Sequence, residues 1–191
     1  GANTDTITVT VNVQDVNEFS PVFGDGDTAT ATPNENQQAV GTYAATDADG
    51  SATQTYSILT AEQNAASVDH DLFSVAGGGV LTFQASPNYE DAGCGAGDNS
   101  NTCAVVIQVT DGANTDTITV TVNVQDVNEA APVFTAGETG TSTPNEGTTA
   151  AGTFAATDTD GTATQTYSIL TAAQNAASVD HDLFSVAGGG V

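Results

Sequence analysis

Oxygen-bearing side chains stand two residues apart at several places in this chain. Asp47 and Asp49 belong to the sequence DADG, and Asp158 and Asp160 belong to DTDG. The sequence QDVNE occurs twice and carries an acid, an amide and a second acid. Calcium takes about six to eight oxygen ligands with loose geometry, so carboxylates and amides gathered from several segments suit it. Zinc prefers sites that contain His or Cys, and neither residue stands among these groups.

Each of these motifs also has a purely structural explanation. The sequence DADG favours a turn, because Asp side chains accept hydrogen bonds from nearby backbone and Gly tolerates a positive φ. A calcium site is therefore indicated by the whole set of acids and amides rather than by any one motif.

The charge balance restricts the partners of this chain. It contains no Lys or Arg against 24 Asp and Glu, which gives a formal net charge of −24. Nucleic acids and anionic membrane surfaces are excluded as partners, because both are bound through basic side chains. Self-repulsion among the acids opposes a compact fold, so dissolved cations are expected to neutralise them. Only His70 and His181 can form a side-chain ion pair.

The chain is built from near-identical repeats. Residues 1–80 and 112–191 share 65 of 80 positions, and residues 1–18 return unchanged as residues 112–129. We therefore predict the last strand and linker of one repeat at 1–18, a complete repeat at 19–129, and the first part of the next at 130–191. No targeting segment or membrane-spanning apolar run is found, and we expect the chain to be a window from a longer array.

Alternating apolar and polar residues predict an all-β fold. In residues 116–126, Ile118, Val120, Val122 and Val124 point to one face of a strand, while Thr and Asn side chains point to the other. Further strands are expected at 23–30, 40–46, 53–59, 72–75, 80–84 and 104–109, with a short helical turn within 60–71. Seven short strands in one repeat indicate a two-sheet sandwich. The predicted core is Val105, Ile107, Val109, Val120, Val122, Val124, Tyr56, Ile58, Phe73 and Leu81.

The two cysteines, Cys94 and Cys103, flank the polar sequence GAGDNSNT. A disulfide that closes so short a loop would stabilise the fold by about 2 to 3 kcal/mol, less any strain. It would also indicate an oxidising, extracellular setting. A metal site with two Cys ligands is the alternative, although the spacing is not that of a zinc knuckle and no His is near in the sequence.

The sequence Asp69-His70-Asp71 recurs at residues 180–182. One hypothesis for it is a metal site or a catalytic base. The other, which the following strand favours, is a turn or capping role. The chain contains no Gly-x-Ser-x-Gly elbow, no HExxH helix and no phosphate-binding loop, so we predict that it is not an enzyme.

Taken in order, the acidic motifs resemble those of the cadherin repeat family, in particular its bacterial cadherin-like members. PNEN and PNEG stand where the family has a Pro-Glu-Asn-like motif, and DADG and DTDG match its Asp-x-Asp-x-Gly-like turn. PNYE matches its Leu-Asp-x-Glu motif loosely, and DVNEFSPVF and DVNEAAPVF match its linker. The resemblance covers the whole chain. It implies a seven-stranded Greek-key, immunoglobulin-like β-sandwich in each repeat, with calcium bound where repeats meet.

Several residues depart from the family pattern. Asn88 stands where the family has Asp, Glu18 and Glu129 replace the second linker Asp, and Phe19 and Ala130 replace its second Asn. Oxygen ligands remain at most positions. The residues predicted to bind calcium are Asp15, Asn17, Glu18, Glu35, Asp47, Asp49, Glu90, Asp111, Asp126, Asn128, Glu129, Asp158 and Asp160.

Three functions follow from different classes. The first is a calcium-rigidified stalk, filament or adhesin segment at the cell surface or outside the cell, which contacts neighbouring repeats and possibly like chains in a fibre. The second is a glycan- or self-binding module. Such a module is expected to expose aromatic side chains, and the chain has only four Tyr, seven Phe and no Trp. The third is a non-catalytic array attached to a secreted enzyme. Near-identical copies favour the first, because a spacer needs length and stiffness rather than a distinct site in each unit.

Overall fold

The computed structural model describes residues 1–49, 53–91, 93–94, 100–160 and 164–188. The turn glycines Gly50 and Gly161 of the DADG and DTDG motifs lie outside these ranges. The chain forms two compact units, residues 1–125 and 126–191. No helix among the described residues is long and apolar enough to cross a membrane.

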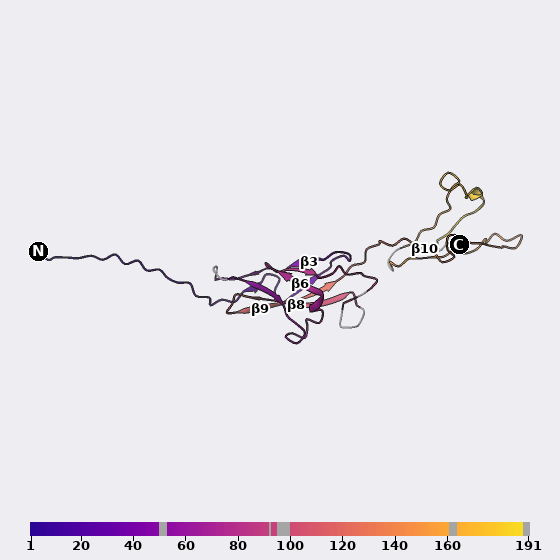
Figure 1. Cartoon of the computed structure of the whole chain (residues 1–191). Helices are drawn as coiled ribbons and strands as arrows, with labels where there is room; N and C mark the ends of the chain where they lie inside the picture. Colours follow the sequence, from indigo (N-terminus) through magenta and orange to yellow (C-terminus); the bar gives the residue numbers. More distant parts are fainter. Residues whose placement is uncertain (50–52, 92, 95–99, 161–163, 189–191) are drawn as a thin grey trace. The chain divides into compact units, whose positions relative to one another are not determined.

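The first unit contains a four-stranded sheet built around one long hairpin (Figure 1). Strands β8 (Thr102–Thr110) and β9 (Thr115–Asn123) pair antiparallel over their whole length. Strand β2 (Thr28–Ala31) runs parallel to β9, and β5 (Thr55–Ile58) runs antiparallel to β8. The sheet order is therefore β2-β9-β8-β5.

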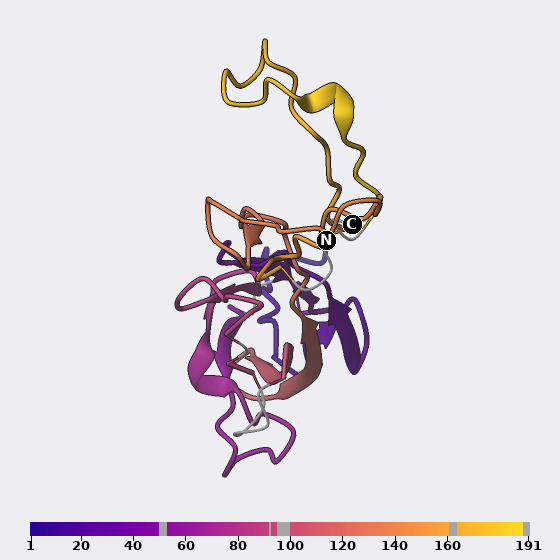
Figure 2. The same ribbon diagram turned by 90° about the vertical axis from the view of Figure 1, so that its right-hand side faces the viewer.

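A second sheet of three strands completes the sandwich. Figure 2 shows the ribbon turned by 90° about the vertical axis. The order of this second sheet is β3 (Ala39–Thr42), β7 (Val80–Phe83) and β6 (Phe73–Ala76). Strand β1 (Val22–Phe23), which precedes β2, pairs antiparallel with β4 (Ala45–Thr46), which follows β3. The predicted all-β sandwich is confirmed.

Two predicted strands are each divided in the structure. The strand expected at 23–30 is broken between β1 and β2 by a turn in which Gly26 adopts a φ of 76°, a conformation that glycine reaches without steric cost. The strand expected at 40–46 is divided at Tyr43 and Ala44 into β3 and β4. The first break lets one stretch of chain pair with β4 and then with β9.

The alternation in β9 produces the core. Ile118, Val120 and Val122 are fully buried, and the intervening Thr119 and Thr121 are half-buried. The predicted core is confirmed except at Tyr56 and Ile58, which are half-buried and pack against it. Both lie on β5, which is an edge strand of its sheet and therefore has a neighbouring strand on one side only.

The segment between β5 and β6 attaches to β8 through side chains. Asp69 accepts a hydrogen bond from the Ala104 N–H at 2.7 Å, and the Ser67 hydroxyl accepts one from the Val106 N–H at 3.0 Å. Both polar side chains are buried. The 3₁₀ turn η1 (His70–Leu72) follows. The helical turn predicted within residues 60–71 is therefore found only at the end of that range. The Asp69 side chain bonds to β8 and does not cap this turn.

The predicted disulfide is present. Cys94 and Cys103 are joined, with their Cα atoms 4.7 Å apart. Cys103 lies in β8 opposite Val122, and both cysteines belong to the core.

The second unit repeats the local geometry of the first. Strands β10 (Val133–Phe134) and β11 (Ala156–Thr157) pair in the register of β1 and β4. The 3₁₀ turn η2 (His181–Leu183) corresponds to η1, and His181 Nε2 lies 3.0 Å from Asp182 Oδ1.

Residues 1–18 contain no strand, although their sequence is that of residues 112–129. Ile7 is 87% exposed, whereas its counterpart Ile118 in β9 is 0% exposed. The same sequence thus forms a strand only where β8 and β2 flank it.

This pair of identical sequences provides a matched test. In the 191-residue chain, Ile118→Ala should lower the free energy of unfolding by about 2 to 5 kcal/mol, because it leaves a cavity in the core. Ile7→Ala should change it by less than about 0.5 kcal/mol, because the side chain is in water. Urea denaturation measures both values, and equal effects would contradict the burial of β9.

Candidate metal centre

Four predicted ligands converge at one end of the first unit. Asp47 and Asp49 follow β4, Asp111 follows β8, and Asn17 comes from the N-terminal segment. We call Asn17, Asp47, Asp49 and Asp111 the proximal cluster. Each Asp stands directly after or within three residues of a strand end, so the sandwich fixes the backbone that carries it.

Asp49 is held from both sides. Its side chain is 5% exposed and accepts a hydrogen bond from the Phe19 N–H at 2.7 Å. Its own N–H donates to Asp47 Oδ1 at 2.8 Å. The turn explanation of DADG and the ligand explanation are thus compatible, because the turn bond occupies one oxygen of Asp47 and leaves the other.

The second oxygen of Asp47 is unusual. Asp47 Oδ2 is buried and accepts no hydrogen bond from the part of the chain that the structure describes. A buried carboxylate oxygen without a donor is destabilising, because the group loses its hydration without replacement. A bound cation would remove this cost.

Asn17 lies between two carboxylates. One end of its side-chain amide lies 3.0 Å from Asp111 Oδ2 and 3.1 Å from Asp49 Oδ2, and its hydrogen bonds are satisfied when this end is the NH₂ group, which donates to both carboxylates. Turned by 180°, the amide would direct its oxygen at the same two carboxylates. The NH₂ orientation suits a site without a cation, and the oxygen orientation suits a site with one.

Asp111 is fixed by the turn between β8 and β9. Its Oδ1 accepts hydrogen bonds from the Asn114 N–H at 2.6 Å and the Ala113 N–H at 2.7 Å. The Asn114 bond is the main cause that holds the pKa of Asp111 below its usual value, against the opposing effect of burial. The carboxylate therefore stays ionised, as a metal ligand must be.

Sequence reasoning missed Asn114. Its side-chain NH₂ donates to the Phe19 carbonyl at 2.8 Å and so ties the N-terminal segment to the β8–β9 turn. The available signal was the sequence Asp-Gly-Ala-Asn between two strands, in which Gly112 has a φ of 98°.

The second unit reproduces part of this arrangement. Asp160 is 2% exposed and accepts a hydrogen bond from the Ala130 N–H at 2.7 Å, as Asp49 does from Phe19. The Asp160 N–H donates to Asp158 Oδ1 at 3.1 Å. One carboxylate oxygen of Asp160 also lies within 4.8 Å of one from Glu129.

Two more predicted ligands lie together in the first unit, and we call Glu35 and Glu90 the distal pair. One carboxylate oxygen of each lies within 4.8 Å of the other. Glu35 is 2% exposed and accepts a hydrogen bond from the Tyr89 N–H at 2.8 Å. Glu90 is exposed, and its N–H donates to Asn88 Oδ1 at 2.9 Å.

The other predicted ligands are less enclosed. Asp15, Glu18, Asn128 and Glu129 are exposed, and Asp126 is half-buried. Their role as ligands stays a prediction.

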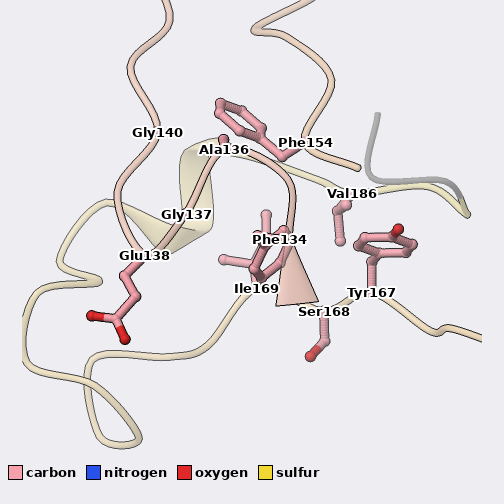
Figure 3. A pocket seen from close by; sticks show the side chains of 10 residues that line it. All are labelled: Phe134, Ala136, Gly137, Glu138, Gly140, Phe154, Tyr167, Ser168, Ile169 and Val186. Atoms are coloured by element: carbon pink, nitrogen blue, oxygen red, sulfur yellow. The ribbon is translucent and has the colours of Figure 1, made fainter. Parts of the chain in front are cut away.

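An apolar pocket of about 260 Å³ lies in the second unit (Figure 3). Phe134, Phe154, Tyr167, Ile169 and Val186 line it. Their counterparts in the first unit belong to or pack against its core, beneath β8 and β9. Residues 126–191 hold no counterparts of these two strands, so the pocket is an open core face rather than a ligand site.

Comparison with known proteins gave structural similarities only. No family model and no curated protein matches the chain. A human Protocadherin-24 EC1-2 structure is 21% identical with a TM-score of 0.49, over 74% of this chain and 62% of that one. The human Desmocollin-1 ectodomain is 25% identical with a TM-score of 0.47, over 64% and 23%. The Protocadherin GammaB4 extracellular domain is 23% identical with a TM-score of 0.48, over 64% and 18%.

These structures are cadherin ectodomain repeats, and the chain spans less than two thirds of the length of each. With TM-scores below 0.5, the likeness assigns neither a family nor a function. The bacterial cadherin-like resemblance stays a prediction.

The lowered pKa of Asp111 predicts a pH dependence in chelator. A lowered folded-state pKa gives stability that is fully present above the unfolded-state pKa and is lost as pH falls through the folded-state pKa. Asp111→Asn should therefore destabilise the chain at neutral pH, and its difference from the parent chain should vanish on acidification. Urea midpoints across pH measure this difference. Asp5→Asn, which removes an exposed charge, is the control, and a difference that persists in acid would contradict the assignment.

Proposed function

We propose that this chain is a calcium-binding segment of an extracellular stalk, filament or adhesin, in which it serves as a structural spacer. The observation that carries the proposal is the proximal cluster. There, the Asp47 Oδ2 atom is buried and accepts no hydrogen bond from the described residues, and the Asn17 amide lies 3.0 Å from Asp111 Oδ2 and 3.1 Å from Asp49 Oδ2.

The donor set fits calcium by its chemistry. All candidate ligands offer oxygen, and the cluster combines three carboxylates with one amide. Mg²⁺ demands near-octahedral geometry and retains water, whereas Ca²⁺ accepts irregular oxygen cages assembled from separate segments. Asp47, Asp49, Asp111 and Asn17 would hold the ion, and the buried Asp47 Oδ2 would gain a partner.

Electrostatics supports the same ion. With no Lys or Arg in the chain, its negative charge cannot be balanced by side chains other than the two His residues. A divalent ion removes two charges of repulsion and adds a shared coordination shell. Binding to the folded state alone would also stabilise it by mass action.

The architecture supports a spacer role and an extracellular location. Near-identical repeats give length without diversifying their surfaces, and the disulfide is typical of oxidising compartments. The role needs no catalysis. Partners would be calcium ions, neighbouring repeats of the same chain and, in a fibre, like chains.

We further propose, from the order of the sequence motifs, that calcium stiffens the link between repeats. Asp126, Asn128 and Glu129 follow the last strand of the complete repeat, and Asp158 and Asp160 belong to the next one. With calcium, these acids and the distal pair would share ions. Without it, their mutual repulsion would leave the linker flexible.

Calorimetric titration of calcium into the chelator-treated chain tests the main proposal. We expect binding with a Kd of about 0.1 to 1 mM, as is usual for extracellular modules. Asp47→Asn/Asp49→Asn should lower the number of ions bound, because it removes two charged ligands. Asp25→Asn/Asp27→Asn removes two exposed acids at the same spacing in the same unit and should leave binding unchanged. Absence of binding at millimolar calcium, or equal loss in both variants, would refute the proposal.

Small-angle scattering tests the proposed stiffening. An array of two complete repeats should show a larger maximum dimension in calcium than in chelator, because ion binding replaces repulsion in the linker. Asp158→Ala/Asp160→Ala should remove the difference, whereas Glu138→Ala, at an exposed acid of the same unit, should preserve it. Identical dimensions in calcium and chelator would show that these acids do not control the linker.

A further inference from the structure

The two members of the distal pair are held differently: Glu35 follows a β-bridge between Asn34 and Gln125, whereas Glu90 lies in a connection between two strands. No strand among the described residues lies between the end of β7 at Phe83 and the start of β8 at Thr102. Glu90 stands within this connection. Its position must therefore come from contacts other than a β-ladder.

Hydrogen bonds clamp the residues just before Glu90 from two directions. On one side, Pro87 O accepts the Asn36 N–H at 2.9 Å, and the Tyr89 N–H donates to Glu35 Oε2 at 2.8 Å. On the other side, the Asn101 side-chain NH₂ donates to Tyr89 O at 2.9 Å. The carbonyl of Asn101 in turn accepts the Val124 N–H at 2.9 Å, which joins it to the end of β9.

The Cys94–Cys103 disulfide lies close in sequence to both residues of the bond from the Asn101 side chain to Tyr89 O. Cys103 lies in β8 and is 0% exposed, and Cys94 is 4% exposed. Cys94 and Ser100 also exchange backbone hydrogen bonds at 3.0 and 3.2 Å. The bridge thus anchors the chain four residues after Glu90, and it flanks Asn101, the residue that holds Tyr89.

Such an anchor matters because the distal pair is electrostatically unfavourable without a cation. Its two carboxylates approach within 4.8 Å, and no Lys or Arg exists to offset their repulsion. A loosely held connection would let Glu90 move away and lose the geometry that a cation needs. Fixing the connection before binding reduces the ordering cost of ligand capture.

We propose that the Cys94–Cys103 disulfide and Asn101 position Glu90 beside Glu35, so that the bridge sets the cation affinity of the distal pair but not that of the proximal cluster. This inference rests on the proposed calcium binding. It gives the disulfide a role in the site as well as in the stability of the sandwich.

The test is an NMR calcium titration of the 191-residue chain, in which both sites are followed in one sample. The amides of Tyr89 and Glu90 report on the distal pair, and those of Phe19 and Asp49 report on the proximal cluster. In Cys94→Ala/Cys103→Ala, the apparent Kd at the distal amides should rise by about fivefold or more, the equivalent of roughly 1 kcal/mol. The Kd at the proximal amides should stay unchanged and serve as the internal control.

A second variant keeps the test decisive if loss of the bridge unfolds the unit. Asn101→Ala retains the disulfide and removes only the bond to Tyr89 O, so it should weaken the distal site selectively. Unchanged distal affinity in Asn101→Ala, or equal weakening at both sites in either folded variant, would overturn the inference. Calcium-induced shifts at the proximal amides alone in the parent chain would refute the distal site and leave the proposed function standing. No shifts at either site would refute both.

Discussion

Every carboxylate of this chain must be accommodated without Lys or Arg. The structure meets this constraint with the backbone. Among the described residues five acids are buried, and each accepts at least one hydrogen bond from a main-chain N–H; these acids are Glu35, Asp49, Asp69, Asp111 and Asp160. Hydrogen bonds to an ionised acceptor are stronger than those between neutral groups, so backbone amides can keep an acid charged without a salt bridge.

The buried acids that accept backbone hydrogen bonds have different roles. Asp69 bonds to β8 and fastens a loop to the sandwich, which is a structural task. Asp49 Oδ2 accepts the Phe19 N–H and also faces Asn17, whereas Asp111 uses Oδ1 for its backbone bonds and presents Oδ2 to Asn17. A carboxylate has about four lone-pair sites, so one or two backbone donors orient it without exhausting its capacity. The same bonds that satisfy these acids therefore also orient the oxygen atoms of the proposed cation site.

Much of the fold could be predicted from the sequence because it depends on period-2 alternation. Residues 116–126 alternate without interruption, and the buried face of β9 follows directly from that pattern. Tyr56 and Ile58 were expected to be buried, but the position of β5 at a sheet edge depends on the order of strands, which local periodicity does not encode. The division of the strand at 23–30 depends on Gly26, whose positive φ could not be read from its neighbours.

The residue types of the candidate site could be predicted from the sequence, but which of these residues lie together in space could not. The spacing of Asp47 and Asp49 indicated a turn or a ligand pair, and the structure shows the turn hydrogen bond, while their role as ligands stays a prediction. Asn114 escaped notice because its contribution is a contact with Phe19, 95 residues away in sequence. Residues 1–18 show the same limit, since an unchanged sequence is buried in β9 and exposed at the N-terminus. In each case a distant partner, rather than the local sequence, decides the outcome.

The two copies of the repeat differ in a way that separates the acids by role. Twelve of their 15 differences fall within residues 19–43, so this stretch tolerates change. Within it, the exposed Asp25 is replaced by Ala136, whereas Pro33, Asn34 and the buried Glu35 are kept as residues 144–146. Asp47 and Asp49 are likewise kept as Asp158 and Asp160, although the residue between them changes from Ala to Thr. If the acids served only to give negative charge, Asp25 and Glu35 would be equally replaceable. The retention of Glu35, Asp47 and Asp49 while Asp25 is lost indicates that their positions matter, as both their backbone hydrogen bonds and the proposed coordination of a cation would require.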